Sequence, residues 1–316
     1  MKGLVVSLIV VGSLLLVGGG TVFAIGVARA NKDAKVVTKE YAVEGYSNVN
    51  IDLQTADLEF KVSTDGTRKV VCVEREKRYH TVNVENDTLV IKGFDSRKWY
   101  ENIFRFDWKP MSVTVYAPSE AYSDGVIKTS TGNIIIPSDY TFDKLNVEAS
   151  TGNIKVKSNA VTSANVKAST GNVSLEMKTK NLTVNTSTGD VDLNKVDVEE
   201  KVIINTSTGH IHLTETKAKN MELKASTGNV KLANTIVEEN MNIKTSTGDV
   251  RFDDSDANVL IEVKTSTGDV EGTLLTGKNF QLSTHTGHIK PVDSVTGSGT
   301  CKVTTDTGNI KLSVKK

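Results

Sequence analysis

The sequence predicts an all-β protein built on a parallel β-solenoid of about ten rungs, each about 20 residues long. Two observations predict this fold. A glycine-centred phrase such as TSTGNI or ASTGNV recurs from residue 129 onward, with 18 to 21 residues from one glycine to the next. Between these glycines, apolar and polar residues alternate with the period of two that is typical of half-buried strands.

Equivalent positions of the units are chemically uniform. The second residue after each repeat glycine is Ile or Val, and the second residue before the preceding threonine is Thr or Ala. One unit offers only about five apolar side chains, too few to offset the backbone entropy of some twenty residues, so the units must stack. Antiparallel hairpins are the alternative, but they would not require the same residue at the same place in every unit. The repeat glycines are Gly132, Gly152, Gly171, Gly189, Gly209, Gly228, Gly248, Gly268, Gly287 and Gly308.

An apolar segment precedes the β region. Residues 3–28 contain no charged side chain and are long enough to cross a bilayer, so we expect residues 1–30 to form a transmembrane anchor in contact with membrane lipid. A cleaved signal peptide is the alternative, because Ala28, Arg29 and Ala30 offer a small-x-small site. Basic residues after the segment favour a cytoplasmic body by the positive-inside rule.

The rest of the chain divides into three parts. Residues 31–39 are expected to form a linker, and residues 40–125 a divergent β domain without the glycine phrase that caps the first rung. Residues 126–316 are expected to form the solenoid. The chain stops soon after its last repeat, so we expect the terminal rung to expose backbone donors and acceptors and to favour self-association.

Three features together resemble a known family. They are the apolar amino-terminal span, the segment MSVTVYAPSE (111–120) leading into IKTSTGNI (127–134), and the train of STG units. With them, residues 40–316 look like the bacterial putative-adhesin β-strand-repeat family, whose domain is one of unknown function. The resemblance implies a β-solenoid, a location in the cell envelope and no established catalytic residues. We therefore expect a single-pass protein of the cell membrane with an extracytoplasmic body, against the count of basic residues.

An aromatic and basic segment at residues 93–110 is the first candidate interaction surface. Aromatic side chains interleaved with arginine are typical of interfaces. The alternative is a hairpin whose aromatics plug the first rung. The candidate residues are Trp99, Tyr100, Phe104, Arg105, Phe106 and Trp108.

A column of lysines is the second candidate. Lys224, Lys244 and Lys264 occupy the same outward position in successive units. Stacked ammonium groups repel one another unless an anion or the neighbouring glutamates relieve them. The column could therefore touch an anionic wall polymer or lipid headgroups, although a solvated face would show the same pattern.

Other chemistry is disfavoured. Ten copies of the STG phrase indicate a structural corner rather than one nucleophile. His210 and His212 lie about 19 Å along the rod from His285 and His288 at the usual strand spacing, so the two pairs cannot share a metal. The corner residues Asp190, Asp249 and Asp269 lack the glycine-rich pattern of calcium-binding rolls. Cys72 and Cys301 are expected to be buried, inert and too far apart for a disulfide. We expect no cofactor and no metal.

These observations favour a non-enzymatic, membrane-anchored envelope protein that serves as an adhesin or a surface-interaction scaffold. A regulatory or sensory partner in an envelope-stress system, binding another membrane protein through residues 93–110, is the alternative. An enzyme that processes polysaccharides is less favoured, because the even repeat spacing leaves no long loop to build a cleft. The balance of 38 basic and 38 acidic residues argues against nucleic-acid binding.

Overall fold

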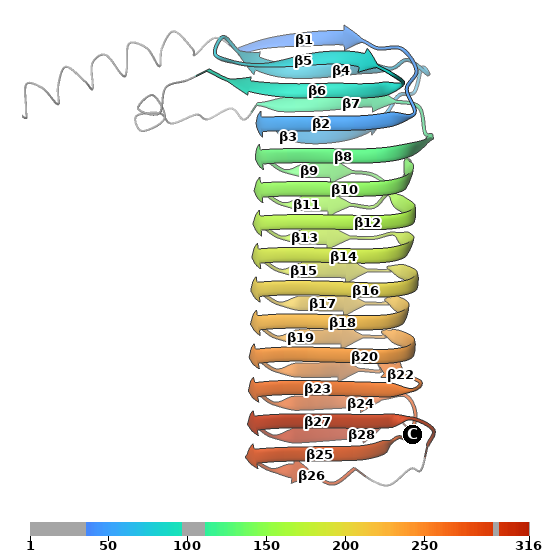
Figure 1. Ribbon diagram of the computed structural model, residues 1–316, viewed down its shortest axis with the longest axis vertical. Coiled ribbons are helices and arrows are strands. Elements are labelled where there is room, and N and C mark those ends of the chain that lie inside the picture. Colours follow the sequence, from blue (N-terminus) through green and yellow to red (C-terminus); the bar gives the residue numbers. More distant parts are fainter. Residues whose placement is uncertain (1–35, 97–110, 293–296, 316) are drawn as a thin grey trace, which may run out of the picture.

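The computed structural model describes residues 36–96, 111–292 and 297–315. All 28 strands in these ranges belong to one hydrogen-bonded sheet, which coils into a rod (Figure 1). The predicted anchor at residues 1–30 lies outside the described residues. Among those that are described, no helix is long and apolar enough to cross a membrane.

Seven strands form the N-terminal cap. The edge strand β1 pairs antiparallel with β4, and β4 pairs antiparallel with β5 and β7. Strands β2 and β3 run parallel to the first strands of the rod, so the cap continues the sheet of the solenoid. The cap strands are β1 (Val36–Ala42), β2 (Asn48–Thr55), β3 (Asp57–Val62), β4 (Lys69–Arg75), β5 (Arg78–Glu85), β6 (Thr88–Asp95) and β7 (Ser112–Ala117).

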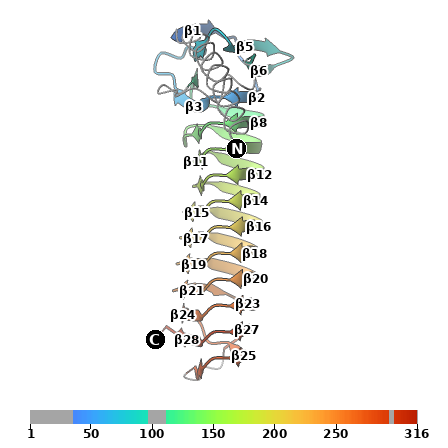
Figure 2. The same ribbon diagram turned by 90° about the vertical axis from the view of Figure 1, so that its left-hand side faces the viewer.

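Each rung of the rod contributes one long strand to one face and one short strand to the opposite face (Figure 2). The long strands are β8 (Ala121–Thr131), β10 (Thr141–Thr151), β12 (Asn159–Thr170), β14 (Lys178–Thr188), β16 (Asp197–Thr208), β18 (Lys217–Thr227), β20 (Ile236–Thr247), β23 (Leu260–Thr267), β25 (Asn279–Thr286) and β27 (Thr300–Thr307), with β22 (Asp256–Ala257) preceding β23. The short strands are β9 (Ile134–Ile136), β11 (Ile154–Val156), β13 (Val173–Leu175), β15 (Val191–Asn194), β17 (Ile211–Thr214), β19 (Val230–Ala233), β21 (Val250–Asp253), β24 (Val270–Leu274), β26 (Ile289–Lys290) and β28 (Ile310–Val314).

Equivalent residues of neighbouring units stand directly beside one another. Leu182 pairs with Val202, which pairs with Met221, and this register continues to Met241. All these pairings are parallel, so the predicted parallel solenoid is confirmed and the hairpin alternative is wrong. The coil makes about nine turns, and its ten long strands match the ten glycine-centred units of the sequence.

The last two units are stacked out of chain order. Strand β27 lies between β23 and β25, and β28 lies between β24 and β26 (Figure 1). The expectation that the chain's last unit forms the open end is therefore wrong, because β25 and β26 form it. Pro291 directly follows the two-residue strand β26, and a proline without a backbone N–H favours an edge position.

The repeat glycines form a column at the first corner of each rung. Gly228 has a φ of +146°. A Cβ atom added there would lie 1.9 Å from the carbonyl oxygen of Gly209 in the preceding rung. Both the backbone conformation and the close approach of the rungs therefore require glycine.

The residue after each repeat glycine builds a hydrogen-bond ladder along this corner. Its side-chain acceptor receives the backbone N–H of the equivalent residue in the next rung, at 2.6–3.0 Å. Only a short side chain with an acceptor at the γ-branch can fill this role, which explains why Asn, Asp and His alternate here. The ladder begins in the cap with Asp57, which follows Ala56 rather than a glycine, and continues in rod order with Asn133, Asn153, Asn172, Asp190, His210, Asn229, Asp249, Asp269, Asn309 and His288.

A second corner, which the sequence reasoning missed, follows the short strands. Lys195, Glu215, Asn234 and Asp254 occupy it in successive rungs, with φ between +48° and +55°. Among non-glycine residues, Asn and Asp tolerate this left-handed conformation best. The sequence pattern of this corner is weak because Lys and Glu occupy the position in two rungs.

Candidate functional site

The predicted lysine column is assembled by the register of the long strands. Lys224 pairs with Lys244 across β18 and β20, and Lys244 pairs with Lys264 across β20 and β23. All three side chains are exposed. Adjacent parallel strands are about 4.8 Å apart, so the three lysines present a row of positive charge along one face of the rod.

Glutamates on the same strands neutralise both ends of the lysine column. Lys224 forms an ion pair with Glu222, and Lys264 lies 2.8 Å from Glu262. Hydrogen bonds from Lys224 and Lys264 lower the pKa of Glu222 and Glu262 respectively. Both carboxylates are therefore ionised near neutral pH and compete with any external anion for these lysines.

The central lysine of the column lacks such a partner. Asn242 occupies the place beside Lys244 that a glutamate fills in the two flanking rungs. Within the described part of the chain, Lys244 forms no ion pair, whereas Glu262 also attracts Lys302 at 3.7 Å. Lys244 is therefore the most available cation of the column.

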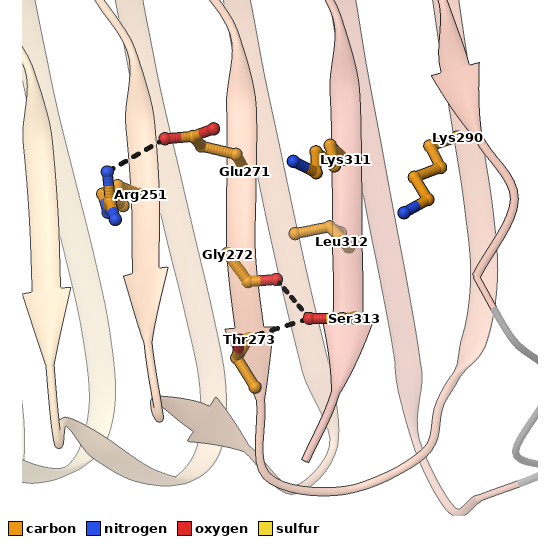
Figure 3. A pocket seen from close by; sticks show the side chains of 8 residues that line it. All are labelled: Arg251, Glu271, Gly272, Thr273, Lys290, Lys311, Leu312 and Ser313. Atoms are coloured by element: carbon orange, nitrogen blue, oxygen red, sulfur yellow. Dashed lines mark hydrogen bonds and ion pairs between the residues drawn. The ribbon is translucent and has the colours of Figure 1, made fainter. Parts of the chain in front are cut away.

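The opposite face of the rod carries a second basic row, which begins on the rung of Lys244 and continues toward the open end. Arg251, Glu271, Lys311 and Lys290 stand in register on four neighbouring short strands, as Figure 3 shows. They line a shallow groove of about 290 Å³. The sequence reasoning missed this row, although a signal existed: each residue stands three positions after a repeat glycine.

The groove is polar and positively charged. Arg251 Nη1 lies 3.1 Å from Glu271 Oε1, so this pair is neutral overall. Neither Lys290 nor Lys311 forms an ion pair with another described residue. At Gly272 the backbone of the neighbouring rung leaves no room for a side chain, because an added Cβ would lie 1.9 Å from the carbonyl oxygen of Phe252. The groove can therefore hold a small anion or one unit of an anionic chain.

The aromatic candidates Trp99, Tyr100, Phe104, Arg105, Phe106 and Trp108 lie outside the described residues. The structure describes only the start of their segment. There, Phe94 stacks on Tyr79 with ring centroids 5.2 Å apart, and the two residues are 41% and 39% exposed. An exposed aromatic pair thus leads into the segment.

The histidine and aspartate candidates have structural partners. The His210 and His212 rings stack with centroids 5.7 Å apart, and His212 Nδ1 lies 3.2 Å from Asp192 Oδ1. One oxygen each of Asp190, Asp249 and Asp269 accepts a ladder hydrogen bond.

The two cysteines are buried and unpaired with each other, as predicted. Cys301 continues the inward column of Met221, Met241 and Ile261.

A comparison with protein families shows to which family this chain belongs. The profile of the family described as Toastrack DUF4097 matches residues 46–313. The chain belongs to the Toastrack DUF4097 family. The family resemblance inferred from the sequence is thereby confirmed. No curated protein matches the chain.

Several solved structures are similar to this chain. A "putative adhesin" from Parabacteroides distasonis is 14% identical with a TM-score of 0.48, and a "putative lipid binding protein" from the same organism is 16% identical with a TM-score of 0.46. A "putative adhesin" from Bacteroides fragilis is 15% identical with a TM-score of 0.37. Each match covers 89% of the present chain and 98% of the other.

Proposed function

We propose that this Toastrack DUF4097 protein is a non-enzymatic surface-interaction scaffold whose rod binds an extended anionic polymer of the cell envelope. The observation that carries the proposal is the register of Lys224, Lys244 and Lys264, which places three exposed cations in one row. A polymer with regularly spaced anionic groups can contact several rungs at once, and such multivalent contacts add avidity without any deep pocket.

The charge pattern supports a polymer rather than a single small anion. The column spans three rungs, and the second basic row, with Arg251, Lys290 and Lys311, lies on the opposite face of the same end of the rod. The whole chain is neutral, so the positive charge is local and directs an anion to this end.

The proposal includes anchorage at the cell membrane. Residues 3–28 are uncharged and would hold the protein in the bilayer with the rod on the extracytoplasmic side. Protease treatment of intact cells whose wall has been made permeable tests this orientation. Digestion of the rod is expected, and full protection would contradict the extracytoplasmic placement.

A second candidate function is binding of another membrane protein through residues 93–110. The exposed stack of Phe94 on Tyr79 favours it, because exposed aromatic pairs are typical of interfaces. Deleting residues 97–110 should abolish co-purification of a specific membrane partner, whereas the polymer-binding function should be unaffected.

The polymer proposal is tested by measuring the affinity of full-length protein, held in zwitterionic nanodiscs, for fluorescent long-chain polyphosphate. The triple variant K224Q/K244Q/K264Q is expected to bind about tenfold to hundredfold more weakly at low salt, since a lysine near an anionic surface contributes about 1 kcal/mol.

A matched control variant separates the effect of the lysine column on binding from the effect of total charge. K155Q/K180Q/K217Q removes three exposed lysines that do not share a column. It should bind nearly as well as the parent protein. Equal losses in the two triple variants would show that total charge, rather than the column, determines binding.

A further inference from the structure

A buried cluster of three metal-binding side-chain types lies in the N-terminal cap. Cys72 and Glu74 are two residues apart on β4, and His80 is the third residue of β5. A sulfur, a carboxylate oxygen and a ring nitrogen of the three residues all lie within 4.8 Å of one another. The residues are only 0%, 1% and 3% exposed, so the cluster is shielded from bulk water.

Hydrogen bonds already orient two of the three groups. Glu74 Oε1 accepts the backbone N–H of His80 at 2.6 Å and lies 3.2 Å from His80 Nδ1. The other oxygen, Oε2, lies 2.8 Å from the Lys39 ammonium. Two ligands on a tetrahedral zinc ion with bonds of about 2.0 Å would be about 3.3 Å apart, so the nitrogen and oxygen already have the required separation.

The three ligand types suit a borderline metal. Imidazole nitrogen, thiolate sulfur and carboxylate oxygen are the ligands that bind zinc, and the Cys72 thiol must give up its proton when a metal binds. Calcium and magnesium prefer oxygen ligands alone, whereas a set of sulfur, nitrogen and oxygen is typical of zinc.

We propose that Cys72, Glu74 and His80 form a binding site for a divalent metal ion of the zinc type. Binding forms a metal–sulfur bond and releases the thiol proton to solvent, with no change of oxidation state. The thiolate and the carboxylate neutralise the two positive charges of the ion. Lys39, whose side chain is 48% exposed, can then turn to solvent.

The position of the site between β4 and β5 indicates what a bound metal would do to the cap. The edge strand beside it, β1, pairs only with β4 among the described strands, so local opening of this edge gives the ion a path. The ligands come from β4 and β5, whose direct pairing is limited to Arg75 and Arg78. A metal would therefore join two strands that share few backbone hydrogen bonds and would stabilise the cap.

Cobalt(II) titration of the full-length, tag-free protein in detergent micelles tests the site. A thiolate-to-cobalt charge-transfer band in the near ultraviolet should saturate at about one equivalent. One equivalent of zinc should remove the band. Absence of the band in the parent protein at a small molar excess of cobalt would overturn the proposal.

Variants assign the ligands. C72A should abolish the band, and H80Q should weaken zinc binding by more than about tenfold. C301A is the matched control, because Cys301 is equally buried but lies in the solenoid core at the far end of the rod. A band that survives C72A, or one that C301A removes, would contradict the assignment. The titration of the parent protein tests the site even if C72A fails to fold.

Discussion

The backbone N–H of Asn229 donates a hydrogen bond to Nδ1 of His210 in the preceding rung, at 3.0 Å. The proton of this imidazole must therefore reside on Nε2. His210 Nδ1 thus accepts the hydrogen bond that an Asn or Asp side-chain oxygen accepts elsewhere in the ladder. The side chain of His210, which could suggest a metal site, therefore helps to stack the rungs.

Substitutions at His210 should follow acceptor geometry. H210N keeps an acceptor at the same place, so the free energy of unfolding should change by less than about 0.5 kcal/mol. H210A leaves the N–H of Asn229 to water and should lose about 0.5–1.5 kcal/mol. Urea unfolding followed by far-UV circular dichroism measures both. H212A is the control, because the His212 ring approaches the Asp192 side chain rather than a backbone N–H; a larger loss there would contradict the ladder.

The glycine column should not tolerate a methyl group. In G228A the new Cβ would lie 1.9 Å from the Gly209 carbonyl oxygen, and φ at this position is +146°. Backbone strain of this kind alone costs about 1–3 kcal/mol, and the clash adds to it. We expect the midpoint of urea unfolding to fall sharply. G45A, whose Cβ would have no atom closer than 4.0 Å, should leave the midpoint almost unchanged.

Removing the internal competitors of the lysine column should strengthen polymer binding. In E222Q/E262Q, Lys224 and Lys264 lose their carboxylate partners, so the affinity for polyphosphate should rise severalfold at low salt. E199Q/E238Q alters exposed glutamates that form no ion pair with described residues and is the control. Equal gains in affinity in both variants would show that net charge causes the effect.

The carboxylates of Glu222 and Glu262 should make polyphosphate binding depend on pH. Their pKa values lie below the ordinary 4.5, so they stay ionised as the pH falls to that value and become protonated only below it. Polyphosphate binding by the parent protein should therefore strengthen as the pH falls below about 4.5. E222Q/E262Q should show a smaller rise over the same range, and an identical pH profile would contradict this explanation.

The open end of the rod should promote dimer formation. Phe280 and Leu282 of β25 are only partly buried, and Ile289 of β26 is 38% exposed. An unpaired strand edge with apolar residues favours pairing with a second copy, and β25 carries no Asp, Glu, Lys or Arg that would oppose it. Sedimentation velocity of the full-length protein in detergent should show a concentration-dependent dimer.

A lysine pointing toward the partner should block this dimer. L282K should shift the protein to monomer, whereas S283K adds the same charge on the exposed side of β25 and should dimerise more strongly than L282K. Circular dichroism checks that both variants fold. A parent protein that stays monomeric at all concentrations would contradict the prediction.

The stacking could be predicted from the sequence because the columns are chemically uniform. The spacing of the repeat glycines and the Ile or Val two positions later fix which residues pair. The same uniformity concealed the order of the last two units, since either Phe280 or Cys301 fits beside Ile261. The signal that was overlooked is Pro291, which favours the edge position for β26.

The two sites differ in how far the sequence predicted them. The lysine column follows from the repeat register alone, so it could be named in advance. The cluster of Cys72, Glu74 and His80 has no repeat to reveal it, because it depends on how β4 and β5 meet within the irregular cap. Cys72 by itself is simply a buried thiol, and only the structure shows its neighbours.

The salt dependence of polyphosphate binding tests most directly whether the in-register lysines form the binding surface. Each lysine that contacts the polymer releases bound counterions, so the slope of log K against log salt counts these contacts. The slope should be smaller by about 2 in K224Q/K244Q/K264Q than in the parent protein, and K155Q/K180Q/K217Q should keep the parent slope. An unchanged slope in the column variant would contradict the account.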